Sequence, residues 1–287
     1  MVKFHSEQAT FIPQVQINVK DLEASISFYQ QVIGLSVIEK KGSHYAALGV
    51  DEECPFLILH VPKNVRHPEK NRTGLYHFAI LLPDRVSLGV IMRHLMSQNI
   101  PFGAADHDVS EALYLSDIDG NGIEIYADRN PDEWKWTGQE VYMTTKRIDQ
   151  EGLLQVSEGH AWTGKMPKET IMGHLHLHVA DLIETHAFYE ALGFEIVASG
   201  PTVMFMSTSQ YHHHIAINVW NGEGIAPQEP FTVGLERAIV RFPSAHSLEK
   251  SIERLHQIDA TVIKVDERYE AVDPSGNRFT LTLACSK

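Results

Sequence analysis

The chain has few cysteines and no apolar run of membrane-spanning length. Its two cysteines among 287 residues, Cys54 and Cys285, stand far apart and show neither metal-ligand nor redox spacing, as is usual in a reducing compartment. No basic leader followed by an apolar segment opens the sequence, and no apolar stretch approaches the roughly 20 residues that cross a bilayer. We therefore expect a cytoplasmic protein without a membrane partner.

Cations are also scarce. Lys and Arg number 24 against 37 Asp and Glu, which gives a formal net charge of -13. Nucleic-acid binding depends on clustered Lys and Arg facing phosphates, so we expect no nucleic-acid partner. Histidine, by contrast, occurs 17 times, and several copies lie close together in strand-like segments. Because histidine is the commonest metal ligand, the placement of these residues bears directly on function.

Two stretches of the chain resemble each other. VQINVKDLEASISFYQQVIGL at 15–35 and LHLHVADLIETHAFYEALGF at 175–194 share a strand, a V-x-D-L segment, a helix with F-Y, and a glycine. Each predicts a short alternating strand, an Asp at the helix start, an amphipathic helix with Phe and Tyr on its inner face, and a glycine stop.

A second pair of stretches matches differently. Residues 74–128 and 234–283 each read as a strand, a helix and two strands separated by D-x-x-G-N, in which Asp and Gly supply the turn chemistry. The chain length allows two ordinary domains. The matches divide it into an N-terminal half (1–130), a connecting segment (131–170) and a C-terminal half (171–287). The four units lie at about 10–60, 74–128, 171–221 and 234–284. We expect the long connection to be packed rather than free.

This four-unit pattern resembles the vicinal oxygen chelate superfamily, which holds glyoxalase I, the fosfomycin-resistance proteins and the type I extradiol dioxygenases. The resemblance covers nearly the whole chain and rests on the repeated D-L…F-Y…G and D-x-x-G-N signatures. It implies an α+β fold of four β-α-β-β-β modules forming two cupped mixed β-sheets. It also implies a divalent cation between two facing units, chelated by neighbouring oxygens of the substrate. The fold alone does not name the reaction.

In this superfamily the metal ligands lie on the first and last strands of a unit. The residues of this chain at those positions are Gln14, His77, His174 and Arg237 on first strands, and Glu124 and Thr280 on last strands. The first and fourth units thus offer a poor set for a cation. The second and third offer His77, His174 and Glu124, a facial triad that suits Fe(II) with open positions and that also binds Mn(II).

Each histidine of the triad has a structural alternative, since a lone strand histidine is more often a buried, hydrogen-bonded residue. His176 and His178 alternate with His174 on the same face of one strand and compete with it. His174 is preferred because it follows Gly173, as the first ligand follows glycine in the G-H-x-x-x-x-V-x-D segment of extradiol enzymes.

A site of this kind requires the second unit to face the third. That arrangement resembles the cross-paired halves of single-chain glyoxalase I enzymes, and pairing between subunits of a homo-oligomer would serve equally well. If the first unit faced the second instead, the site would hold Gln14, His77 and Glu124, and the dioxygenase interpretation would weaken.

Acid-base residues follow from the same resemblance. YHHHIAINVW at 211–220 resembles the H-H-x-L-A-I strand of extradiol dioxygenases, whose second histidine is the acid-base catalyst, here His213. Tyr114 lies ten residues before Glu124, as does the tyrosine that binds a substrate oxygen. His107 occupies the place of a further histidine, at a slightly shorter spacing. A core tyrosine and a solvated loop histidine are the structural alternatives for these two.

The remaining histidines are left without a catalytic role. His212 and His214 point opposite to His213 if the strand is regular, so at most one face of the triple histidine enters the site. His60 ends the last strand of the first unit, and we interpret it as structural.

The predicted function is therefore an extradiol dioxygenase of aromatic catabolism. It would take a small aromatic diol and O2 and open the ring beside the two hydroxyls. One alternative is a glyoxalase-like isomerase or lyase, which would normally want two carboxylate ligands, and only Glu124 is evident. The other is a metal-free binding protein of the same fold, for which a ligand set drawn from two units is hard to explain. Candidates for the pocket wall, whose direction the sequence leaves open, are Phe205, Met206, Trp220 and Trp162.

Overall fold

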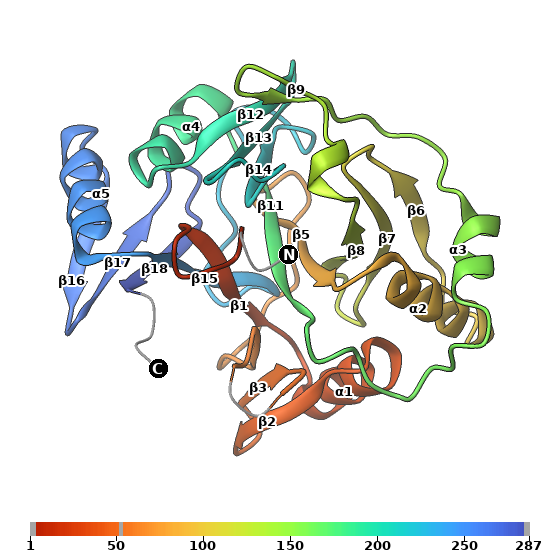
Figure 1. Cartoon of the computed structure of the whole chain (residues 1–287). Helices are drawn as coiled ribbons and strands as arrows, with labels where there is room; N and C mark the ends of the chain where they lie inside the picture. Colours follow the sequence, from red (N-terminus) through yellow and green to blue (C-terminus); the bar gives the residue numbers. More distant parts are fainter. Residues whose placement is uncertain (1–3, 52–53, 284–287) are drawn as a thin grey trace.

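The structure is a computed structural model that describes residues 4–51 and 54–283 (Figure 1). Cys285 lies outside these residues, and Cys54 is an exposed free thiol. Within the described ranges, no helix combines the length and the apolar character needed to cross a bilayer.

The first of two eight-stranded mixed sheets combines the first and fourth units, in the order β16-β17-β18-β15-β1-β4-β3-β2. Its strands are β1 (Phe11–Asn18), β2 (Ser36–Lys41), β3 (Tyr45–Gly49), β4 (Leu57–His60), β15 (Gly234–Phe242), β16 (Thr261–Val265), β17 (Arg268–Val272) and β18 (Arg278–Leu283). Strands β1 and β15 pair antiparallel at its centre.

The second sheet combines the second and third units, in the order β12-β13-β14-β11-β5-β8-β7-β6 (Figure 1). Its strands are β5 (Gly74–Leu82), β6 (Gly103–Asp106), β7 (Ser110–Ser116), β8 (Gly122–Asp128), β11 (Ile171–His178), β12 (Glu195–Gly200), β13 (Val203–Ser207) and β14 (Ile215–Asn218). Strands β5 and β11 pair antiparallel at its centre. The predicted facing of unit two and unit three is confirmed, and it occurs within one chain.

Each unit carries one helix, and short elements occupy the connection between the halves. The unit helices are α1 (Leu22–Phe28, continued by the π-turn Tyr29–Ile33), α2 (Arg85–Ser97), α4 (Leu182–Ala191) and α5 (Ala245–Gln257). The connection contains a 3-10 turn (Pro131–Glu133), β9 (Trp136–Thr137), β10 (Glu140–Val141) and α3 (Gln150–Val156). The predicted α+β fold of four β-α-β-β-β modules is confirmed.

The helix boundaries follow the predicted start and stop residues. The Asp21 side chain accepts from the backbone N–H of Ala24 at 3.0 Å, and Asp181 accepts from that of Glu184 at 2.8 Å. Such caps satisfy backbone donors that have no partner inside the helix. The glycine stops, Gly34 and Gly193, have φ angles of 88° and 98°, where a side chain would be strained.

The connection between the halves is packed, as expected from its length. Leu153 of α3 is fully buried, and its carbonyl oxygen lies 2.3 Å from where a Cβ would stand on Gly89 of α2. Helix α3 therefore lies so close to α2 that only glycine fits at this contact.

Two repeated signature residues join the sheets to each other. The Tyr29 hydroxyl donates to Oδ2 of Asp117 at 2.8 Å, and the Tyr189 hydroxyl donates to Oδ2 of Asp273 at 2.9 Å. Each tyrosine comes from the F-Y segment of one unit, and each aspartate opens the D-x-x-G-N turn of the next. Units one and two belong to different sheets, and so do units three and four, so these two buried hydrogen bonds link one sheet to the other.

Tyr189→Phe should destabilise the protein in a pH-dependent way. Burial raises the pKa of Asp273 from its usual 3.8 to about 6, against the lowering effect of hydrogen bonds from Asn277 and Tyr189. The folded state thus binds this proton more tightly than the unfolded chain, so the contribution of the carboxyl to stability is favourable below about pH 4 and is lost as the pH rises through about 6. Removing the Tyr189 hydroxyl destabilises the ionised carboxylate of Asp273 more than its protonated form.

We expect a loss of about 1–3 kcal/mol in the free energy of unfolding at pH 7.5 and a smaller loss at pH 5, measured by urea denaturation. Tyr142→Phe is the matched control, because this tyrosine is exposed, and its change should stay within about 0.5 kcal/mol. A larger loss for Tyr189→Phe at pH 5 than at pH 7.5 would contradict the assignment.

Candidate metal centre and catalytic cavity

Three side chains of the second sheet form a compact ligand cluster. One ligand atom from each of His77, Glu124 and His174 lies within 4.8 Å of the others. Oε2 of Glu124 is 3.0 Å from Nε2 of His77 and 3.1 Å from Nε2 of His174. All three side chains are buried, and they come from β5, β8 and β11.

Strand pairing explains why these residues meet. Across the sheet, His174 lies beside Ala79, Ala79 beside Glu124, and Glu124 beside Tyr114. Residues paired in this way point to the same face of a sheet, so these four form one row. Ala79 lies between His174 and Glu124 in this row, and its small side chain leaves space between them.

A second row runs alongside the first. Phe205 pairs with Ala216, Ala216 with His176, and His176 with His77. The third ligand thus comes from the neighbouring row, which makes the triad a triangle rather than a line. The direct partner of His77 in the sheet is His176, not His174, and the ring centroids of His77 and His176 are 5.0 Å apart.

The triad suits a divalent cation. Nε2 of His77 is buried and has no hydrogen-bond partner among the described residues, because its short contact with Glu124 lacks hydrogen-bond geometry. Burial lowers the pKa of His174 to about 4, so its imidazole is neutral near pH 7. Burial alone would raise the pKa of Glu124, but the interactions with His174 and His77 outweigh it and hold that pKa well below its usual value. A neutral imidazole and a carboxylate are the forms that bind metal.

His213 lies against the triad, with its ring centroid 4.0 Å from that of His174. Burial, together with the neighbouring histidines, lowers its pKa well below the usual value. Its Nδ1 lies 2.7 Å from Nδ1 of His212, whose Nε2 donates to Oδ1 of Asp128 at 2.8 Å. His212 and Asp128 thus hold the side chain of His213 in place.

The triple histidine does not follow regular strand alternation, since β14 begins only at Ile215. His212 contacts His213 directly instead of pointing away from it. His214 lies deeper, and its Nε2 donates to the carbonyl of Phe4 at 2.9 Å. Only His213 of the three lines the cavity beside the triad, in accord with the expectation that one face would enter the site.

Tyr114 and His107 form a hydrogen-bonded pair. Nδ1 of His107 donates to the carbonyl of Thr144 at 2.7 Å, which leaves Nε2 to accept from the Tyr114 hydroxyl at 2.6 Å. Burial and the nearby charge of Glu124 raise the pKa of Tyr114 well above its usual value, so the phenol remains protonated. The structure thus brings His107 to Tyr114 despite the shorter spacing in the sequence.

A cavity of about 520 Å³ opens onto these groups. His77, Glu124, Tyr114, His107 and His213 line it, and the buried His174 adjoins them through Glu124. Its wall also includes Phe205 and Trp220, two of the four candidates taken from the sequence. Of the other two, Met206 lies in the hydrophobic core, and Trp162 stacks on His94 with ring centroids 4.5 Å apart.

Sheet one has no such ligand cluster at the equivalent positions, as far as the structure describes it. Nη1 of Arg237 donates to Oε1 of Glu270 at 3.1 Å, and Oγ1 of Thr280 donates to the same oxygen at 2.8 Å. Nε2 of Gln14 donates to the carbonyl of Pro55 at 2.6 Å. The positions that hold the candidate ligands in sheet two are thus occupied in sheet one by polar side chains that bond within the sheet. The histidine of this sheet, His60, contacts Oδ1 of Asn18 through Nδ1 at 3.1 Å.

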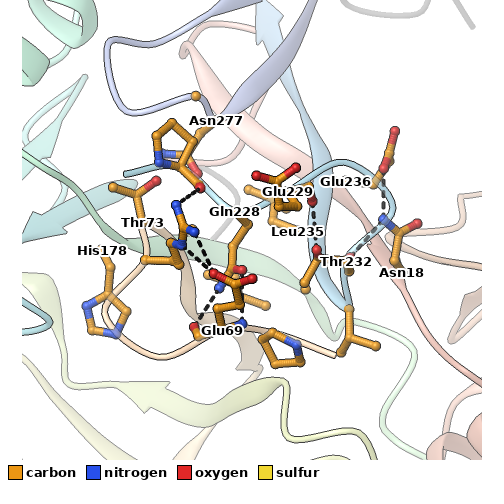
Figure 2. Close-up of a pocket in the computed structure, with 18 of the residues that line it drawn as sticks. Asn18, Glu69, Thr73, His178, Gln228, Glu229, Thr232, Leu235, Glu236 and Asn277 are labelled. Atoms are coloured by element: carbon orange, nitrogen blue, oxygen red, sulfur yellow. Dashed lines mark hydrogen bonds and ion pairs between the residues drawn. The ribbon is translucent and has the colours of Figure 1, made fainter. Parts of the chain in front are cut away.

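Another cavity, of about 340 Å³, lies where the loops between units meet the two D-x-x-G-N turns. Figure 2 shows that its polar side chains partner one another. Nε of Arg72 donates to Oε2 of Glu69 at 2.9 Å, and Nδ2 of Asn18 donates to Oε2 of Glu236 at 2.8 Å. His178 faces this cavity rather than the triad. Because these side chains already bond to one another across the loops between units, we assign this cavity to the joining of units.

Several contributors to the site were not found from the sequence. Asp128 and His212 support His213, and no spacing rule pointed to their contact. Thr144 lies in the connection between the halves, which has no counterpart elsewhere in the repeat. The only available signal was for Asp128, which lies four residues after Glu124 near the end of the same strand.

The fold and the ligand positions define a known class of protein. The chain belongs to the Glyoxalase/Bleomycin resistance protein/Dioxygenase superfamily, whose family model matches residues 11–125 and 171–281. Over its full length it is similar to Catechol-2,3-dioxygenase of Bacillus subtilis (strain 168). The two are 41% identical over 289 residues, which cover 99% of this chain and 100% of that protein.

Solved structures share the fold. A crystal structure of a dioxygenase candidate from Bacillus subtilis subsp. subtilis str. 168 has a TM-score of 0.67 at 13% identity, over 96% of this chain and 86% of that one. Glyoxalase I from Zea mays has a TM-score of 0.58 at 16% identity, over 95% and 92% of the two chains. At such identities these likenesses establish the fold and leave the reaction open.

Glu124→Gln should abolish tight binding of a divalent cation, because Gln brings no negative charge to the triad. We expect the affinity for Mn(II) or Co(II) to fall more than about 100-fold, since removing even an outer partner of a metal ligand costs 10- to 100-fold. Isothermal titration and metal analysis after dialysis would measure it. Glu270→Gln makes the same change in sheet one and should leave metal binding as in the wild type. Equal loss in both variants would mean that the effect is on folding.

Proposed function

We propose that this protein is an extradiol dioxygenase that opens a catechol-type ring beside its two hydroxyls, with Fe(II) held by His77, His174 and Glu124. The observation that carries the proposal is the position of this triad beside one cavity that His213 and Tyr114 line. The similarity along the whole chain to a protein named Catechol-2,3-dioxygenase supports it. The substrates would be a small aromatic diol and O2. We place the reaction in the cytoplasm, where an exposed thiol such as Cys54 remains reduced.

The cation would act as a Lewis acid that lowers the pKa of the bound diol and would offer positions for the diol and O2. The same two imidazoles and one carboxylate would also suit Mn(II). His77, His174 and Glu124 would hold it on one side and leave the cavity side open.

His213 would be the acid-base residue. Burial keeps its imidazole neutral, so Nε2 can accept a proton from a ring hydroxyl and return it when the ring opens. His212 and Asp128 hold Nδ1 of His213 from behind, which leaves Nε2 as the atom available to the substrate. A residue positioned in this way loses little freedom when the substrate arrives.

Tyr114 would orient the second ring oxygen. Its hydroxyl donates to His107, and Thr144 fixes the tautomer of that histidine. The pair therefore presents a phenol oxygen that is held in place and can accept from a substrate hydroxyl. Because burial keeps Tyr114 protonated, its role would be positioning rather than proton removal.

Two other functions fit the site less well. A glyoxalase-like isomerase would want a second carboxylate ligand, and the described residues place only Glu124 in the cluster. A metal-free binding protein would not need a buried imidazole nitrogen without a hydrogen-bond partner beside a carboxylate.

Anaerobic reconstitution with Fe(II) or Mn(II), followed by catechols and air, tests the proposal. We expect uptake of O2 and a yellow ring-opened product. Bound metal without O2 uptake across a panel of catechols and hydroquinones would favour the isomerase, and absence of bound metal would favour the binding protein.

His213→Ala should lose turnover and keep its metal. We expect kcat to fall about 10²- to 10⁴-fold, the usual contribution of a general acid-base residue, with metal content as in the wild type. His60→Ala, which changes a histidine of sheet one, is the control and should keep kcat within about twofold. Loss of metal in His213→Ala would show that the residue is a ligand rather than an acid-base group.

A further inference from the structure

His176 is a buried histidine of the cavity to which the proposed reaction gives no task. It stands in the row of Phe205 and His77, and it lines the cavity. Its ring centroid lies 5.0 Å from that of His77 on one side and 5.3 Å from that of Trp220 on the other. Trp220 and Tyr76 are half exposed, so His176 lies between the triad and the open end of the cavity.

A hydrogen-bond network fixes the tautomer of His176. The backbone N–H of Trp220 can only donate, and it donates to Oδ1 of Asn218 at 3.0 Å. This contact orients the buried Asn218 amide, so its Nδ2 faces Nε2 of His176 at 2.9 Å. Because Nδ2 of an amide only donates, Nε2 of His176 must accept. His176 is therefore neutral and carries its proton on Nδ1.

His178 makes the orientation of Asn218 firmer from the other side. Its Nδ1 lies 2.7 Å from the same Oδ1, which makes His178 a second donor to that oxygen. One amide thus links the two histidines, yet His178 faces the polar cavity of Figure 2 while His176 faces the triad cavity.

We infer that His176 is a specificity-determining residue that donates from Nδ1–H to a neutral oxygen on the substrate ring. The inference rests on the proposed function. A ring anchored at the triad through its two hydroxyls presents its other edge to the walls. Around His176 these walls are the rings of Tyr76, Phe205 and Trp220, which leaves its Nδ1–H as the polar contact on that side.

The charge of the cavity selects the kind of oxygen. Among the described residues that line it there is no Lys or Arg, and Glu124 is its carboxylate. A carboxylate substituent would be desolvated there without a Lys or Arg beside it to balance its charge, which is costly. An ether or carbonyl oxygen accepts one hydrogen bond without carrying charge. The substrate class is therefore a catechol with a neutral oxygen acceptor, such as a methoxy or acyl group.

Pairs of catechols that match in size test this inference. The substrates are 3- and 4-methoxycatechol against 3- and 4-ethylcatechol, with 2,3-dihydroxybenzoate and protocatechuate as the anionic comparison. In the wild type we expect a higher kcat/KM for the better methoxy isomer than for its ethyl partner, and the lowest values for the acids. In His176→Leu the ratio of methoxy to ethyl should fall about tenfold, as expected for loss of one hydrogen bond.

Two further variants isolate the donor. His178→Leu removes the other histidine partner of Asn218 but keeps the contact with the Trp220 backbone, so it should leave the ratio within about twofold of the wild type. His176→Gln keeps an N–H donor and should retain part of the preference, which also covers the case in which His176→Leu fails to fold. Dissociation constants measured without O2 for the same methoxy and ethyl pairs should show the same preference as kcat/KM, because the hydrogen bond from His176 forms when the substrate binds.

The outcomes separate the two proposals. A wild type that cleaves no catechol overturns the proposed function itself. A wild type that cleaves catechols but prefers the ethyl partners or the acids overturns the role of His176. An equal loss for all substrates in His176→Leu does the same, because it would place the donor on an oxygen that every catechol shares.

The tautomer can be checked without metal or turnover. Side-chain ¹⁵N spectra of the metal-free protein, with His176 assigned by its absence from His176→Gln, should show the proton on Nδ1. A proton on Nε2 would contradict the inference, because the donor would then be directed at Asn218 and not at the cavity.

Discussion

The antiparallel pairing of β5 with β11 is the interaction on which the site depends. It sets His174 beside Ala79 and His77 beside His176, so ligands that are separated by almost one hundred residues become neighbours on one face. A slip of one residue would turn every side chain of one strand to the opposite face. The hydrogen bonds from Tyr29 to Asp117 and from Tyr189 to Asp273 tie this sheet to the other.

The two sheets show how one scaffold can carry a candidate metal site in one sheet and a different set of polar side chains at the equivalent positions of the other. In sheet one, Arg237 and Thr280 both donate to Glu270, while Nε of Arg237 is buried without a hydrogen-bond partner among the described residues. In sheet two, Glu124 contacts two histidines, and Nε2 of His77 lacks a hydrogen-bond partner within the described residues. An unsatisfied buried donor or acceptor costs free energy. A bound cation would remove that cost at His77, whereas the unpartnered atom of sheet one belongs to a positively charged guanidinium, which only donates and cannot bind a cation.

Much of this arrangement can be predicted from the sequence, and the reason is the repeat. The family resemblance indicated which strand positions hold metal ligands, and comparing the copies at those positions selected His77, His174 and Glu124, because equivalent positions of a repeat occupy equivalent places in the fold. The pairing of units was predicted from chemistry, since only the second and third units offered side chains that suit a metal ion. The family resemblance supplied His213 and Tyr114, whose positions beside the triad the structure shows, while their catalytic roles remain predictions.

What the sequence did not predict lies where the repeat or regular geometry ends. Alternation placed His212 opposite to His213, but residues 211–214 precede β14 and turn both rings together. Thr144 comes from the connection, which has no second copy for comparison. Trp162 looked like a wall residue by composition, yet it packs on His94 and Gly34. Long-range contacts of irregular segments depend on the whole fold and leave no periodic signal.

The charge of the cavity agrees with the proposed binding of a diol to a divalent cation. Glu124 is the carboxylate of the lining, and no Lys or Arg is among the described residues there. With a divalent cation at the triad, the site would carry one net positive charge. A diol that has released one proton to solvent would balance it, whereas a diol that has lost none would leave a buried charge, which is costly. A neutral imidazole such as that of His213 can then take the second hydroxyl proton, a transfer within the cavity that leaves its net charge unchanged. The same balance disfavours a further anionic substituent, and a neutral donor at His176 is therefore the feature that such a cavity can use to distinguish one ring from another.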